Sequence, residues 1–278
     1  MRKHIAGIDH VVVVVKDLDQ AARTWARLGF TLTPRGYHTM GSQNHCLMFA
    51  RDYIELLAVP VAHPATRHFT DFLAAGEGLA SFALATDDAQ AAHDELAAAG
   101  YAPGVPIDFS RPVALPGGTR DAAFRIVHLP NEATPGSRTF LCQHFSRDVV
   151  WRDEYVHHPL GVTAIAGIAV RSAETDKTAQ AYARFFASAT EPIAEGLRVD
   201  TGSTPLALTD AARLGARLAG VKTTARAGTT LAVLYLRVAD RAVAADVLRK
   251  GGFRPRRLAD GAWAIGADVA NGVALVFG

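Results

Sequence analysis

The feature that most constrains the fold is a unit that recurs along the chain. Its first copy begins with the continuous β-branched run Val11–Val15, which predicts a buried strand. Asp17 can then cap the first turn of a helix, and Gly29 can end that helix in the left-handed conformation. Between them lies an apolar face at helical spacing, formed by Leu18, Ala21, Trp25 and Leu28.

The same pattern returns with the same spacing. Asp17 and Gly29 are twelve positions apart, and so are Asp88 and Gly100, and Asp240 and Gly252. A fourth, weaker copy over 164–189 lacks the closing glycine. Strand-like stretches follow each helix, so each unit is predicted to be β-α-β-β-β. Four such units fill almost all of the 278 residues, which indicates an internal repeat.

A change in composition separates the second unit from the third. The stretch "SRDVVWRDEYVHHPLG" over 146–161 is charged and aromatic, and it ends in Pro and Gly. We therefore predict one domain over 1–145, a linker over 146–161 and a second domain over 162–278.

Charge and hydropathy narrow the function classes. The net charge is +2, and no basic stripe with interleaved aromatic residues is present, so a nucleic-acid partner is not expected. No apolar run is long enough for a membrane span, and the start of the chain lacks the apolar core of a signal peptide. We expect a cytoplasmic protein with a small-molecule ligand or substrate. Whether it is a monomer or a homodimer is left open.

Three stretches carry a resemblance to a known superfamily. They are "IDHVVVVVKDLDQAARTWARLGFTLTPRGYH", "GSQNHCLMFARDYIELLAV" and "FLCQH". Together with the repeat, they resemble the vicinal oxygen chelate superfamily, which includes glyoxalases, bleomycin-resistance proteins and extradiol dioxygenases, and in particular its glyoxalase-like group. The resemblance implies an α+β fold. Its four βαβββ modules would form two cup-shaped mixed sheets with the helices outside.

The resemblance also implies a divalent metal inside a cup. His10, at the head of the first strand, and Glu55, in "DYIELLAV", match two ligand positions. Ser81 stands where His10 would be in the second module, and the last strand offers Gln143 or His144. The implied set is His10 and Glu55 with one of these two, which would suit Zn, Fe, Mn, Ni or Co. The same departures also fit a cup without a metal. The two cysteines, Cys46 and Cys142, form no spaced metal motif.

Other side chains are candidates for binding or proton transfer. In "GYHTMGSQNHCLMF", His38 could act as an acid or base at the mouth of the cup, or it could be a surface histidine. Asn44 could bind a substrate oxygen or stabilise a turn. Arg120 and Arg125, near a predicted hairpin, could bind a substrate carboxylate or form salt bridges at a strand edge.

The histidines are distributed unevenly. The chain has eleven, and none follows His158. We therefore expect function in the N-terminal cup, with a degenerate C-terminal cup that supports it. The resemblance implies a metal-dependent lyase, isomerase or dioxygenase that acts on a small oxygenated substrate, with Glu55 and His38 as catalytic residues. The alternative is a metal-free protein that binds or sequesters a small molecule, as bleomycin-resistance proteins do.

Overall fold

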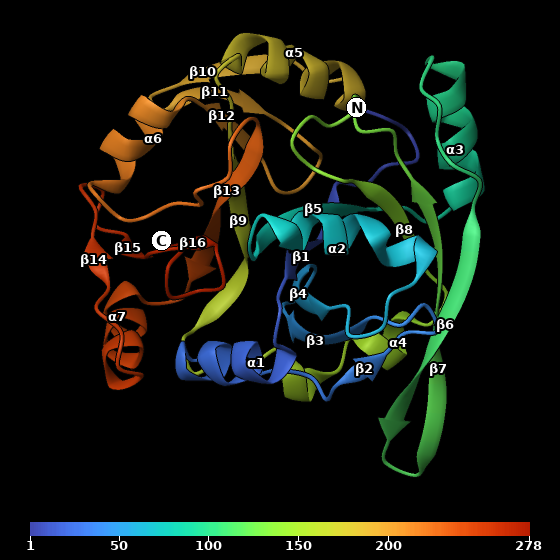
Figure 1. Ribbon diagram of the computed structural model, residues 1–278, viewed down its shortest axis with the longest axis horizontal. Helices are drawn as coiled ribbons and strands as arrows, with labels where there is room; N and C mark the ends of the chain where they lie inside the picture. Colours follow the sequence, from blue (N-terminus) through green and yellow to red (C-terminus); the bar gives the residue numbers. More distant parts are fainter.

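The computed structural model describes residues 1–278 and contains two eight-stranded mixed sheets with helices around them (Figure 1). The first sheet is built from β1 (Ile8–Val14), β2 (Gly36–Tyr37), β3 (Gln43–Met48), β4 (Tyr53–Ala58), β5 (Gly78–Ala85), β6 (Ile107–Leu115), β7 (Gly118–His128) and β8 (Phe140–His144). The second is built from β9 (Val162–Arg171), β10 (Thr190–Ile193), β11 (Gly196–Val199), β12 (Leu206–Thr209), β13 (Thr230–Val238), β14 (Arg256–Arg257), β15 (Trp263–Ile265) and β16 (Ala274–Phe277).

The helices are α1 (Leu18–Arg27), α2 (Arg67–Ala74), α3 (Ala89–Ala98), α4 (Arg147–Val150), α5 (Thr175–Phe186), α6 (Ala211–Leu218) and α7 (Arg241–Lys250). Two short 3-10 helices, η1 (Pro64–Thr66) and η2 (Asp153–Tyr155), complete the elements. None of the helices is both long enough and apolar enough to cross a membrane.

Both sheets have the same strand order. It is β2-β3-β4-β1-β5-β8-β7-β6 in the first sheet and β10-β11-β12-β9-β13-β16-β15-β14 in the second. At each centre, the first strands of two modules run antiparallel, β1 against β5 and β9 against β13. This arrangement confirms the predicted α+β fold of four βαβββ modules in two cups.

The predicted helix caps explain why the unit repeats. Asp17, Asp88 and Asp240 each accept hydrogen bonds from backbone N–H groups in the first turn of α1, α3 and α7. Gly29 and Gly100 have φ values of +94° and +84°, in the left-handed region that favours glycine.

The fourth copy ends without a glycine because Ala187 adopts the left-handed conformation itself, at φ +49°. Its N–H bonds the carbonyl of Ala183, so the last turn of α5 is still closed.

Two helices that the repeat did not predict connect the modules within each cup. In the first cup, α2 places Phe69 against Val12 and Val14 on the concave face of the sheet. In the second cup, α6 packs Leu214 and Leu218 against small residues on the concave face of the second sheet, such as Ala169 and Ala232. The concave face of the second sheet therefore packs against its own helix.

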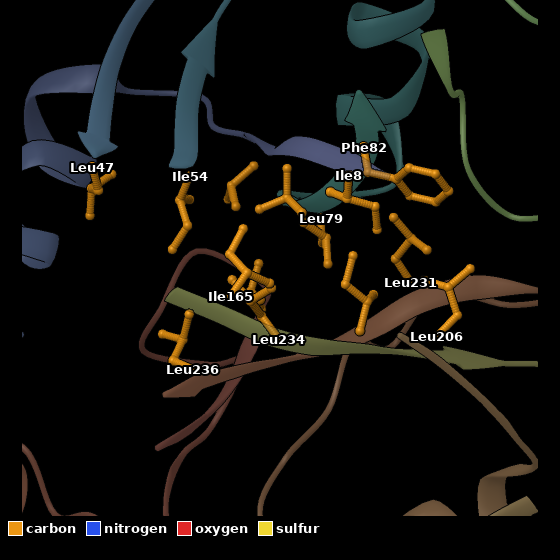
Figure 2. Packing of buried hydrophobic residues seen from close by; sticks show 14 of the residues in the cluster. Ile8, Leu47, Ile54, Leu79, Phe82, Ile165, Leu206, Leu231, Leu234 and Leu236 are labelled. Carbon is orange, nitrogen blue, oxygen red and sulfur yellow. The ribbon is translucent and has the colours of Figure 1, made fainter. Parts of the chain in front are cut away.

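The two sheets share one hydrophobic core. A cluster of 49 buried residues includes side chains from both sheets. Figure 2 shows Ile8, Leu79 and Phe82 of the first sheet facing Leu206 and Leu231 of the second. The predicted linker also packs against the first cup. Trp151 donates a hydrogen bond from Nε1 to the Phe49 carbonyl, and His158 Nδ1 accepts one from the Thr31 N–H.

Candidate active site

The first cup encloses a cavity between its concave face and α2. The cavity has a volume of about 80 Å³. Most of its wall is apolar, with the rings of Phe109, Phe124 and Phe140 from β6, β7 and β8. His10 and Glu55 add polar groups to this wall. Such a cavity accommodates a small molecule that is apolar on most of its surface.

His10 and Glu55 converge in this cavity. β1 and β4 are parallel, and their register pairs His10 with Tyr53 and Val12 with Glu55. Side chains two residues apart on neighbouring strands share a face, so both point into the cup. His10 Nε2 lies 3.8 Å from Glu55 Oε2, and the imidazole stacks on the Tyr53 ring with centroids 4.3 Å apart.

A bulge in β1 places Asp9 beside His10. The antiparallel register with β5 pairs Ile8 with Leu84 and His10 with Ala83, so Asp9 is an extra residue on β1. A bulge breaks strict alternation and can bring successive side chains to one side of a sheet. Asp9 Oδ2 lies 2.7 Å from His10 Nδ1. The carboxylate therefore fixes the orientation of the ring and leaves His10 Nε2 to face the cavity.

His144 holds the same carboxylate from the other side. Its Nε2 lies 3.1 Å from Asp9 Oδ2. Burial alone would raise the pKa of Asp9, but hydrogen bonds from His10 and His144 outweigh burial and hold that pKa well below its usual range. Asp9 is therefore an anion behind His10. Asp9, Cys142 and His144 each offer a ligand atom, and these atoms lie within 4.8 Å of one another, so this buried group could hold a metal ion.

The second module does not supply the ligands that its counterpart supplies. Ser81, at the position of His10, donates its hydroxyl to the Arg138 carbonyl. The register of β5 with β8 pairs Ala83 with Phe140, which puts a phenyl ring at the position of Glu55.

The other expected ligands also lie outside the cavity. Gln143 bonds the Asp87 carbonyl and the Ala89 N–H, and so caps α3. His144 contacts Asp9 rather than the cavity. The expected metal set of His10 and Glu55 with Gln143 or His144 is therefore not assembled.

A metal held by His10 and Glu55 would have two strong donors 3.8 Å apart, since no third histidine, cysteine or carboxylate forms a ligand group with this pair. This falls short of the three protein ligands that catalytic sites usually provide. The His10 and Glu55 pair alone therefore does not fit a resident metal, and its side chains are suited to act as an acid and a base.

His38 and Asn44 both line the cavity. Asn44 Nδ2 donates to Glu55 Oε1 at 2.5 Å, which holds that carboxylate in place. His38 Nδ1 lies 2.8 Å from Ser42 Oγ. Burial lowers the pKa of His38, and the positive charge of Arg111 lowers it further against the opposing charge of Glu55. A half-buried, neutral imidazole at this point can take or give a proton.

Arg120 and Arg125 do not reach the cavity. Arg120 pairs with Asp148 at 2.7 Å, and Arg125 pairs with Asp108 at 2.5 Å, on exposed parts of the β6–β7 hairpin. These two ion pairs match the second possibility for Arg120 and Arg125, which was a salt bridge at a strand edge rather than a bond to a substrate carboxylate. The arginine in the cavity is Arg111, on β6.

Sequence reasoning missed Asp9, Arg111 and His68. Alternation along β1 puts Asp9 on the face opposite His10, and only the bulge overturns that. Arg111 lies on β6 next to Pro112, a residue that is uncommon inside strands. His68 lies on α2, which the repeat did not predict, and lines the cavity.

The fold and the site define the class of protein. Two cups of paired βαβββ modules, one of them enclosing a histidine and a carboxylate, are typical of the vicinal oxygen chelate superfamily. The chain belongs to the glyoxalase-like domain family, whose pattern matches residues 8–186. The resemblance inferred from the sequence is thereby confirmed. No curated protein sequence matches the chain.

Solved structures show the same fold at low identity. A hypothetical protein from Staphylococcus aureus superposes with a TM-score of 0.70 at 15% identity, over 98% of each chain. A mutant of 4-hydroxymandelate synthase from Streptomyces coelicolor gives 0.58 at 14%, over 99% of this chain and 92% of that one. A fusion of a xylose isomerase-like TIM barrel with 4-hydroxyphenylpyruvate dioxygenase gives 0.60 at 16%, over 98% of this chain and 48% of that one.

Proposed function

We propose that the protein is an enzyme that moves a proton on a small oxygenated substrate held in the N-terminal cup. The reaction class is an isomerase or lyase type, begun at a carbon next to a carbonyl group. The observation that carries the proposal is a buried row of contacts, from Asp9 to His10 and from His10 to Glu55. This row lies at the wall of a mostly apolar cavity. A function of the N-terminal half, with the division of the chain at 146–161, is part of the same proposal.

The roles follow from the contacts. Glu55, held by Asn44, is the base that takes the proton from carbon. The electron pair of the broken C–H bond moves onto the carbonyl oxygen of the substrate and forms an enolate. His10 keeps its Nδ1 proton toward Asp9, so its Nε2 can exchange a proton with Glu55 or the substrate oxygen. His38 is a second group on the cavity wall that can return a proton.

Exclusion of water supports these roles. His10 is 3% exposed and Glu55 7%, and the rings of Tyr53 and Phe140 pack against His10. Charges in such surroundings interact more strongly than in water, which favours proton transfer between fixed groups. No step here runs through a metal, since the His10 and Glu55 pair alone does not fit one.

The test is a deuterium-exchange screen by proton NMR with the full-length protein. The panel contains small 2-oxo acids, their amides and neutral hydroxy ketones. We expect at least one compound that binds to lose its C–H signal next to the carbonyl faster with the protein than in buffer. We expect the rate to survive treatment with a chelator and to fall in Asp9→Asn, while Asp121→Asn, an exposed carboxylate, leaves it unchanged. Bound compounds without any exchange would contradict the proposal.

The second candidate is a protein that binds a small molecule without reaction. It is favoured by the second module, in which Ser81 bonds a backbone carbonyl and Phe140 replaces a carboxylate. Saturable binding of panel compounds with no exchange would support this candidate. A rate that disappears with the chelator would instead indicate a metal at Asp9, Cys142 and His144 or in the cavity.

A further inference from the structure

Arg111 is the only buried arginine of the protein, with 8% of its surface exposed. Other arginines, such as Arg35 and Arg217, pair with carboxylates. The guanidinium of Arg111 has no carboxylate within ion-pair distance and no hydrogen bond to any protein group, and it borders the cavity. A largely buried cation without a protein partner depends on water or on a ligand in the cavity for its stabilisation. The cavity is therefore suited to an anion from outside the chain.

The carboxylate that lies in the same cavity is already engaged. Glu55 accepts the amide of Asn44 at Oε1 and faces His10 at Oε2. It does not neutralise Arg111 by direct contact. Two opposite charges thus occupy one small cavity as separate groups, one suited to proton transfer and the other free to bind a ligand.

Gly36 keeps the space around the guanidinium open. A Cβ atom at this position would clash with Asn44 Oδ1 and would lie 3.0 Å from Arg111 Nη1. Asn44 Oδ1 is buried and accepts no hydrogen bond from the protein. Gly36 therefore leaves room at a point where a charged donor and an unsatisfied acceptor meet.

The wall next to Arg111 is aromatic, because Phe109 lies two residues away on β6 and Phe124 pairs with it on β7. The rings of Phe109 and Phe124 stack with centroids 5.0 Å apart, and Phe140 contacts the His10 ring edge to face at 5.5 Å. All three line the cavity with Arg111. A ligand that fits both features has an anionic group at one end and a flat or branched apolar body.

We propose that Arg111 binds the carboxylate of the substrate, and that the enzyme acts on small apolar organic acids. A guanidinium and a carboxylate can form two parallel charge-assisted hydrogen bonds, which fixes the orientation of the ligand as well as its charge. The acid would then present its reacting carbon to Glu55 and its apolar body to the phenyl rings. This proposal rests on the proposed function for its reaction but not for its binding.

Calorimetric titration of the full-length protein with benzoate and benzamide tests the binding directly. The two probes have almost the same shape and differ in charge. We expect benzoate to bind at least tenfold more tightly than benzamide, because a charge-assisted pair in a water-poor site contributes at least that factor. Inorganic phosphate serves as a second anion, and it should bind more weakly than benzoate because it gains nothing from the phenyl rings.

The matched variants are Arg111→Met and Arg120→Met, which remove the same group inside and outside the cavity. Arg111→Met should abolish the preference for benzoate over benzamide, and Arg120→Met should retain it. Arg111→Met should also fold, since the Arg111 guanidinium forms no ion pair or hydrogen bond with another protein group, and thermal denaturation checks this. Should that variant fail to fold, Gly36→Ala provides a second test, because its methyl group intrudes on the Arg111 and Asn44 end and should weaken benzoate binding at least tenfold.

Equal binding of benzoate and benzamide by the wild type would overturn the proposal, and so would a preference that persists in Arg111→Met. Phosphate binding tighter than benzoate binding would overturn the choice of a carboxylate. The two proposals fail separately. Benzoate binding through Arg111 without proton exchange on any bound acid contradicts the enzyme. Exchange on neutral ketones alone, with no preference for acids, contradicts the role of Arg111.

Discussion

Asp52 forms a hydrogen bond between the two cups. Removing its charge, but not this hydrogen bond, should raise the free energy of unfolding by an amount that depends on pH. Its Oδ1 accepts a hydrogen bond from the Ile165 N–H at 3.0 Å, across the boundary between the first sheet and β9. Burial, with a further contribution from the negative charge of Asp9, raises the pKa of Asp52 to about 6 from 3.8. The folded state therefore favours the neutral acid, and ionisation at neutral pH weakens the fold.

A rise of about two pKa units corresponds to about 3 kcal/mol of unfolding free energy at most. This contribution is present in full below pH 3.8 and is lost as the pH rises through 6. Asp52→Asn keeps the acceptor for Ile165 and removes the charge. We expect it to be more stable than the wild type by up to about 3 kcal/mol at pH 8, with the difference shrinking toward zero near pH 4.

Urea denaturation of both proteins at several pH values between 4 and 8 measures this difference. The exposed substitution Asp121→Asn is the control, and its difference from the wild type should vary little with pH. A variant Asp52→Asn that is less stable than the wild type at pH 8, or whose advantage does not change with pH, would refute the reasoning.

Three further predictions concern the core and the cavity wall. Trp25 is fully buried, and its Nε1 donates a hydrogen bond to Asn271 Oδ1 at 3.0 Å. Trp25→Ala should therefore lower the free energy of unfolding by about 3 to 5 kcal/mol in urea denaturation. A loss under about 1 kcal/mol would contradict the packing. Burial lowers the pKa of His68 to about 4, so its contribution to stability is present above pH 6.5 and is lost as the pH falls toward 4. His68→Gln should reduce the acid sensitivity of the thermal midpoint in that interval, and an unchanged slope would refute this. Arg226 donates to the Phe72 carbonyl at 2.6 Å, so Arg226→Ala should speed amide hydrogen exchange in α2 but not in α3; equal protection of α2 in both proteins would argue against this anchor.

The fold could be predicted because its signals are local and repeated. Each aspartate cap and each stop glycine acts within its own helix, so their spacing survives in the structure. The helix of the fourth copy, α5, ends at the expected place although it lacks the glycine, since Ala187 takes the left-handed conformation. The connecting helices α2 and α6 carry no repeat and were not predicted.

The site could be predicted only where it follows strand alternation. His10 and Glu55 face one cavity because they lie two positions apart in a parallel register. Asp9 could not be predicted, because a bulge depends on the pairing with β5 rather than on the residues of β1. Arg111 could not be predicted, because β6 runs through Pro112, a residue uncommon inside strands, and only the pairing with β7 makes this segment a strand. Errors of this kind arise where tertiary pairing decides which way a side chain points.

The central claim is that Glu55 and His10 move a proton in the N-terminal cup. Its most direct test is the rate of carbon-bound deuterium exchange catalysed by Glu55→Gln, measured by proton NMR on the compound that the wild type exchanges fastest. The control is Glu132→Gln, in an exposed loop. A positioned base contributes about 10² to 10⁴ in rate, so Glu55→Gln should exchange at least a hundredfold more slowly, while Glu132→Gln matches the wild type. A Glu55→Gln protein that exchanges as fast as the wild type would contradict the account.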